Sequence, residues 1–150
     1  MAEFDSIKDV ISFAIRLEQA SQEFYRHLCD TVHNPAVRNY LRTLINEEKL
    51  HEQRLQKVLT EIEGILNISI EPEDIQCYIQ AVEVPMSLDY KEAVKVARDK
   101  EKAAQMLYSI IAGTTTDPDM KKLFQQLSAQ EKIHYDFFEK EYLKICISEN

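Results

Sequence analysis

Two halves of this chain carry the same metal-binding residue types at one fixed offset of 83 positions. Each half holds one Glu, one Tyr and one Glu-x-x-His motif, in the same order and with the same spacing. The repeated pairs are Glu18 and Glu101, Tyr25 and Tyr108, Glu48 and Glu131, and His51 and His134. Residues on a solvated surface would have no physical reason to keep the same spacing in both halves. The repeat therefore indicates a pseudo-two-fold helical bundle with two metal ions at its centre.

The composition favours long helices with few interruptions, because only two Gly and four Pro occur among 150 residues. Asn34-Pro35 and Asp117-Pro118, again 83 positions apart, each indicate an N-cap followed by Pro at the first helical position. Gly64 and Gly113 indicate helix ends. We expect one domain over residues 1–150, with helices over about 4–32, 35–63, 88–112 and 118–147.

The segment over about 64–87, between the second and third expected helices, is too long for a tight turn. Two short hairpins joined by one long crossover are the ferritin-like order of a four-helix bundle. The predicted fold class is therefore all-α, a ferritin-like four-helix bundle of two helical hairpins.

Each expected helix has an apolar seam at heptad spacing, with the repeated carboxylates and imidazoles at its middle. Ionised carboxylates inside a bundle cost several kcal/mol each unless they are neutralised. The seams contain no Lys or Arg, whereas two divalent ions would balance four carboxylates. Oxygen-rich ligation with one imidazole per metal suits iron or manganese better than zinc or copper.

The net charge and the cysteine content limit the expected binding partners and cellular compartment. The net charge of −8 disfavours nucleic acid and anionic membranes as partners. Three cysteines without C-x-x-C spacing predict neither a disulfide framework nor a zinc ribbon, so a reducing cytoplasm is expected. Neither a signal-peptide pattern nor an apolar run of membrane-spanning length is seen.

Four motifs carry a resemblance to a known family: AIRLEQASQEFY (14–25), INEEKLHEQRL (45–55), ARDKEKAAQMLY (97–108) and LSAQEKIHYDFF (127–138). With them the chain resembles the ferritin-like di-iron carboxylate proteins, nearest to the rubrerythrin-type group. The resemblance implies that Glu48 and Glu131 bridge two irons and that Glu18 and Glu101 are terminal ligands. The implied ligand set is Glu18, Glu48, His51, Glu101, Glu131 and His134.

The chain departs from rubrerythrins in two features. Their appended rubredoxin domain, with paired C-x-x-C motifs, has no counterpart in these 150 residues, so the resemblance implies a separate electron-donor protein. Rubrerythrins also carry an extra Glu one turn after the third-helix ligand, where this chain has Ala104.

The expected function is that of a di-iron oxidoreductase, in which O2 or H2O2 oxidises a di-Fe(II) centre. Manganese or a mixed metal pair is the alternative occupant. A ferroxidase that feeds an iron store and a structural or sensor module without turnover are the rival functions. We also expect a homodimer or larger homo-oligomer, on the assumption that Phe13, Phe24 and Phe137 are exposed.

Other residues have simpler interpretations. Tyr25 and Tyr108 are either bundle core or hydrogen-bond donors and redox partners of the metal centre. His27 and His33 have no repeat partner and are expected at the surface. The charge runs EEKLHE and DKEKA are, apart from the ligands, expected to be solvated, which includes Lys100. The cysteines Cys29, Cys77 and Cys146 are interpreted as unreactive thiols.

Overall fold

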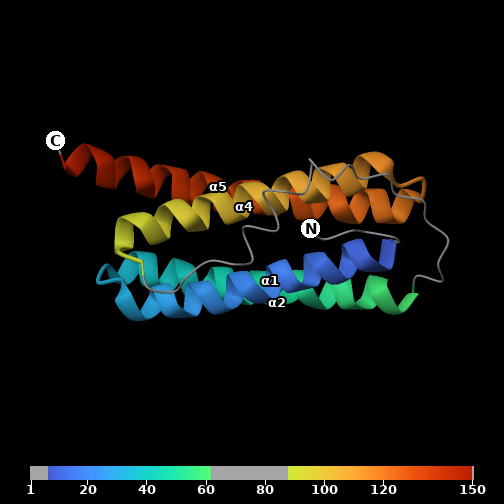
Figure 1. The fold of residues 1–150 in the computed structure, drawn as a ribbon, viewed down its shortest axis with the longest axis horizontal. Coiled ribbons are helices and arrows are strands. Elements are labelled where there is room, and N and C mark those ends of the chain that lie inside the picture. The colour runs from blue at the N-terminus through green and yellow to red at the C-terminus, as the bar shows by residue number, and fades with distance from the viewer. Residues whose placement is uncertain (1–6, 62–87, 150) are drawn as a thin grey trace.

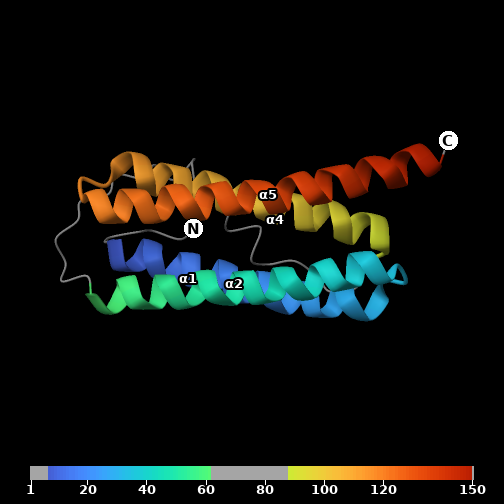
Figure 2. The same ribbon diagram turned by 180° about the vertical axis from the view of Figure 1, so that it is seen from behind.

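The computed structural model describes residues 7–61 and 88–149, and every regular element within these ranges is a helix. The helices are α1 (Ile7–Thr31), α2 (Pro35–Glu61), α4 (Tyr90–Thr114) and α5 (Pro118–Ser148). α1 packs along α2, and α4 packs along α5, so two hairpins form the two layers of an elongated bundle (Figure 1). α2 ends at one end of the bundle and α4 begins at the other, as the reverse view also shows (Figure 2). The predicted all-α four-helix bundle is confirmed.

The N-caps of α2 and α5 form at the two repeated X-Pro pairs. The side-chain oxygen of Asn34 accepts hydrogen bonds from the backbone N–H groups of Ala36 (2.9 Å) and Val37 (3.4 Å). Asp117 accepts from those of Asp119 (2.9 Å) and Met120 (3.1 Å). These bonds satisfy amide groups that have no partner within the first turn of the helix.

The observed helix ends lie within two residues of the expected ones wherever both fall on described residues. The predicted stop at Gly113 is wrong, because α4 continues through this residue to Thr114. Gly113 is exposed, and a Cβ atom there would meet nothing within 4 Å, so the helix accommodates it without strain. The predicted start near residue 4, the stop at Gly64, the crossover over 64–87 and Cys77 lie outside the described residues.

The core consists of two apolar clusters, one on each side of a polar middle layer. One cluster includes Ile11, Leu55, Leu107 and Phe124; the other includes Tyr25, Leu41, Val94 and Phe138. Their side chains come from all four helices. The layer between them holds the repeated carboxylates and imidazoles, which the apolar clusters shield from water along the bundle axis.

The observed burial of three phenylalanines and one lysine corrects two expectations. Phe13 and Phe24 are each only 3 % exposed, and Phe137 is half-buried and stacks on Tyr40, so none supports a dimer through exposed rings. Lys100, expected in a solvated run, is only 4 % exposed, and its ammonium lies 5.7 Å from the centre of the Phe24 ring. The seam pattern describes one stripe of a helix, whereas burial here extends beyond that stripe. The large apolar side chains that are exposed in the described part of the chain are Leu50, Met106, Ile133, Leu143 and Ile147.

The surface assignment of the two unrepeated histidines agrees with the structure. His27 and His33 are exposed, and Cys29 and Cys146 are half-buried free thiols. None of the helices described here is long and apolar enough to span a membrane.

Candidate metal centre

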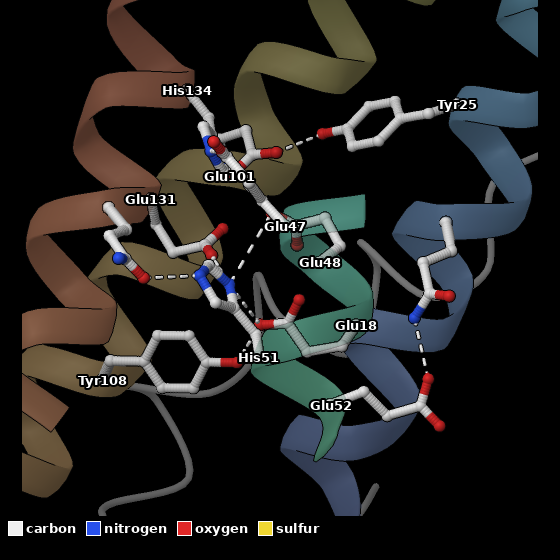
Figure 3. Close-up of polar contacts among 12 residues, drawn as sticks. Glu18, Tyr25, Glu47, Glu48, His51, Glu52, Glu101, Tyr108, Glu131 and His134 are labelled. Carbon is white, nitrogen blue, oxygen red and sulfur yellow. Dashed lines mark hydrogen bonds and ion pairs between the residues drawn. The ribbon is translucent and has the colours of Figure 1, made fainter. Parts of the chain in front are cut away.

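Six side chains from the four helices meet in the polar layer of the bundle. α1 and α4 each contribute one carboxylate, and α2 and α5 each contribute one Glu-x-x-His motif (Figure 3). Because the His follows its Glu by three residues, both side chains of a motif project from the same face of their helix. Each residue is only 1–2 % exposed: Glu18, Glu48, His51, Glu101, Glu131 and His134.

The six residues form two overlapping sets of four, and in each set one ligand atom per residue lies within 4.8 Å of the others. One set contains Glu18 and His51, and the other contains Glu101 and His134. Glu48 and Glu131 belong to both sets. If two metal ions were bound, Glu48 and Glu131 would be shared between them, and one further carboxylate and one imidazole would complete each position.

The histidine distances fit this division. Nδ1 of His51 lies 2.6 Å from Glu131, 3.6 Å from Glu18 and 3.7 Å from Glu48. Nδ1 of His134 lies 3.0 Å from Glu48 and 3.4 Å from Glu101. Both imidazoles therefore present Nδ1 to the carboxylates, and their ring centres lie 6.1 Å apart.

The hydrogen-bond inventory is a test of whether the residues fit a metal pair. In the described part of the chain, each of the six side chains has one buried oxygen or nitrogen without a hydrogen-bond partner. The His51–Glu131 pair is close enough for an ion pair, but its angles do not form a hydrogen bond. Unpaired buried polar atoms destabilise a fold, and six that converge on one point fit a site for cations. Carboxylate oxygens with one imidazole per position suit iron or manganese.

Proton affinities in the cluster show how strongly the carboxylates repel one another. Burial raises the pKa of Glu48 well above its usual range, and the charges of Glu18 and Glu101 raise it further. Burial and the neighbouring carboxylates raise the pKa of Glu131 in the same way. Without metal, these two carboxyls therefore hold protons that divalent ions would displace.

The pKa values of Glu101 and His134 shift in the directions expected for an ion pair. Burial would raise the pKa of Glu101, but its close contacts with Glu131 and His134, together with the charge of His134, outweigh burial and lower the pKa. Burial would lower the pKa of His134, but its close contacts and charge interactions with Glu101 and Glu48 raise it to about 12. In the metal-free cluster, His134 is thus the internal cation that partly neutralises the carboxylates.

Two buried tyrosines cross from one half to hydrogen-bond a carboxylate of the other. The hydroxyl of Tyr25 donates to Glu101, and the hydroxyl of Tyr108 donates to Glu18 (Figure 3). Burial, followed by the charge of the partnered carboxylate, raises the pKa of both phenols well above their usual range, so both remain donors. Each bond leaves the second carboxylate oxygen of its acceptor available to the centre.

The outward nitrogens of the histidines also have partners, which the sequence analysis missed. Nε2 of His51 lies 2.6 Å from Gln130, and Nε2 of His134 lies 2.5 Å from Glu47. Glu47 and Gln130 are 83 positions apart. A search for the repeat by chemical similarity, rather than by identity, would have found them.

A surface pocket of about 330 Å³ opens between α2 and α5 onto the edges of both imidazoles. Leu50 and Ile133, which are 56 % and 63 % exposed, stand in its wall. The pocket is the nearest solvent-facing approach to the cluster among the described cavities. Its lining residues are Glu47, Leu50, His51, Arg54, Gln130, Ile133 and His134.

Comparisons with known proteins agree with this geometry. The sequence model of the Rubrerythrin family matches residues 9–142. A hypothetical protein from Pyrococcus furiosus superposes with a TM-score of 0.73 at 21% identity, over 92% of this chain and 89% of that chain. A putative ferritin-like diiron-carboxylate protein from Thermotoga maritima superposes with a TM-score of 0.71 at 20% identity, over 95% of this chain and 97% of that one. No curated protein matches the chain.

Proposed function

The chain belongs to the rubrerythrin family, and we propose that its buried cluster binds two iron ions that react with O2 or H2O2. The observation that carries the proposal is the convergence of six unpaired ligand atoms on one point of the bundle. Two ferrous ions held by such a set could supply two electrons to one oxidant molecule, one from each ion.

The chain's own residues have three parts in this proposal. Glu48 and Glu131 lie between the two positions and would hold the ions at a short separation. Glu18 and Glu101 would each complete one position, oriented by the phenols of Tyr108 and Tyr25. Four carboxylates would balance two divalent ions, so the occupied site would be neutral.

The apolar clusters on either side limit water to the pocket between α2 and α5. A small oxidant would approach through that pocket, since both imidazole edges line it. Reduction after each turnover would then come from a separate donor protein, as the missing C-x-x-C pairs of a rubredoxin domain in these 150 residues imply.

The test is the iron content after anaerobic loading with Fe(II) and desalting. We expect about two irons per chain in the wild type and close to none in Glu48→Gln, which keeps the shape of the side chain but removes its charge. Glu52→Gln is the matched control on the same helix. Glu52 accepts hydrogen bonds from Gln19 and Gln22 outside the cluster and should leave iron binding unchanged.

Mixing the loaded protein with O2 or with H2O2 then decides among the rival functions. Formation of ferric absorbance with either oxidant supports the oxidoreductase. Two bound irons that react with neither would favour a structural or sensor module, and a large iron-filled particle would favour an iron store. A wild type that binds no iron would overturn the proposal.

A further inference from the structure

The two metal-facing histidines differ in the charge of the group behind them. Nε2 of His134 lies 2.5 Å from a carboxylate oxygen of Glu47, whereas Nε2 of His51 lies 2.6 Å from the amide oxygen of Gln130. Glu47 and Gln130 occupy the same position in the two halves, directly before the Glu of each motif. The pseudo-symmetric centre therefore has an anion behind one imidazole and a neutral amide behind the other.

This difference affects how strongly each imidazole is held in the tautomer whose Nδ1 lone pair faces the carboxylates. When Nε2 donates its hydrogen outward, Nδ1 is left as a free lone pair that faces the carboxylates. A carboxylate can only accept, so Glu47 enforces this tautomer of His134. An amide can turn and donate instead, so Gln130 enforces it less strictly on His51. A charged acceptor also forms the stronger bond and makes the imidazole a better electron donor.

Other charge differences between the two halves act through space, and those at Arg54 and Lys100 act in opposite directions. Arg54, one turn after His51, lines the pocket, whereas Phe137 occupies the matching position after His134. Lys100, next to Glu101, has Leu17 as its counterpart. The positive charge of Arg54 disfavours a cation near His51, and that of Lys100 disfavours one near His134. Glu47 acts through direct contact with a ligand, so its effect is the larger.

We propose that Glu47 makes the two metal positions unequal, so that the position of His134 binds a divalent ion more tightly and fills before that of His51. The inference rests on the proposed function, since it requires that the cluster binds two ions. Glu47 is a positioning residue here, because it acts through His134. Loss of such an outer partner weakens metal binding about 10–100-fold. We therefore expect the two stepwise dissociation constants to differ by about ten-fold or more.

The test is an anaerobic titration of the metal-free chain with Co(II), followed by calorimetry and by visible absorption. Wild type should show two separate steps. Glu47→Gln should weaken the tighter step about 10–100-fold and bring the two steps together. Gln130→Glu should strengthen the weaker step. The double exchange, Glu47→Gln with Gln130→Glu, should restore unequal steps.

Histidine ¹⁵N spectra at one equivalent of Co(II) identify the position that fills. In the wild type the signals of His134 should be perturbed first, and in the double exchange those of His51. A merely structural role of Glu47 would lower both affinities equally and leave this order unchanged, which would overturn the proposal. Glu52→Gln is the control, and thermal unfolding of each metal-free variant confirms that it folds.

The two proposals fail in different ways. If the wild type binds no metal, the proposed function is wrong. If it binds two ions in equal steps, or fills the His51 position first, the function stands and the inequality is wrong.

Discussion

The two hairpins are stabilised by different chemistry at matching surface positions. In the α1–α2 hairpin, Glu52 accepts hydrogen bonds from Gln19 (3.0 Å) and Gln22 (2.8 Å). In the α4–α5 hairpin, the counterparts of Gln19 and Glu52 are Lys102 and Tyr135, whose ammonium lies 5.4 Å from the ring centre. The six buried ligand positions, in contrast, repeat without change.

The difference shows where the chain tolerates change. At the surface, water solvates whichever charges a substitution leaves, so alternative contacts between two helices differ by little in free energy. In the middle of the bundle the charged side chains are buried, so one altered charge leaves several others unpaired. The two halves must therefore be identical at the buried positions of the cluster. They differ at positions next to the cluster, as at Glu47 and Gln130.

The largest expected effect in the comparison comes from the metal itself. At free metal about 100 times each dissociation constant, two ions would stabilise the fold by about 5 kcal/mol. For a chain of this size, the midpoint of thermal unfolding should rise by about 10–20 °C on loading. Chelation should reverse the rise, because it restores the uncompensated carboxylates.

Glu48→Gln and Glu131→Gln should each abolish that metal-dependent rise, and to the same extent, because both residues belong to both positions. The measurement is calorimetric unfolding with and without Fe(II) under anaerobic conditions. If one variant kept most of the rise and the other lost it, the two halves would not share the site equally.

The second expected effect is a pH dependence of the metal-free protein. Glu48 and Glu131 have pKa values raised in the fold, so the stability they contribute is present below the unfolded pKa of about 4.5 and is lost as pH rises toward their folded pKa values. His134 acts in the same sense, up to its pKa of about 12. Glu101, with its lowered pKa, contributes stability that is lost as pH falls.

The two raised carboxyls and His134 outnumber Glu101, so the unfolding free energy should fall as pH rises from about 5 to 8. Each raised carboxyl can contribute at most about 1.4 kcal/mol per pH unit. In Glu48→Gln and in Glu131→Gln the fall should be shallower, and each variant should exceed wild type at the upper end. Urea unfolding in the presence of a chelator measures this. Parallel pH profiles for wild type and both variants would contradict it.

The third expected effect concerns the crossed tyrosines. Tyr25→Phe and Tyr108→Phe each remove one hydrogen bond to a buried carboxylate, so each should destabilise the chain by about 1.5–3 kcal/mol. The two losses should agree closely, because each hydroxyl serves the equivalent carboxylate of the opposite half. Tyr135→Phe, on the half-buried surface, is the control and should change stability by less than about 0.5 kcal/mol. Unequal losses from Tyr25 and Tyr108 would show that the halves differ in the core as well.

Much of this candidate site could be predicted from the sequence, because its carboxylates and imidazoles follow local rules. Heptad spacing places Glu18 and Glu101 on the seams, and a three-residue spacing places each His beside its Glu. The six repeated carboxylates and imidazoles on these seams are buried. Asn34 and Asp117 likewise cap their helices through contacts two and three residues away.

Features set by contacts between distant segments could not be predicted in this way. The pairing of His134 with Glu47 joins residues 87 positions apart on different helices, and periodicity within one helix does not encode it. The burial of Phe13, Phe24 and Lys100 depends on what covers the faces of α1 and α4 beyond their seams. The Glu-to-Gln difference at Glu47 and Gln130 also hides their equivalence from a search by identity.

The smallest expected effect compares the two helix caps. Asn34→Ala and Asp117→Ala should each destabilise the chain by about 1 kcal/mol, since each leaves backbone amides of a first turn unpaired. The loss at Asp117 should be larger by a few tenths of a kcal/mol. Its second bond is shorter, 3.1 Å against 3.4 Å at Asn34, and its charge interacts favourably with the helix N-terminus.

Asn34→Asp isolates the contribution of charge, because it makes the first cap resemble the second. It should stabilise the chain by about 0.3–1 kcal/mol at low ionic strength, and added salt should reduce the gain. Urea unfolding of the metal-free chain at two salt concentrations measures both quantities. A gain that persists unchanged in high salt would mean that bond geometry, rather than charge, distinguishes the two caps.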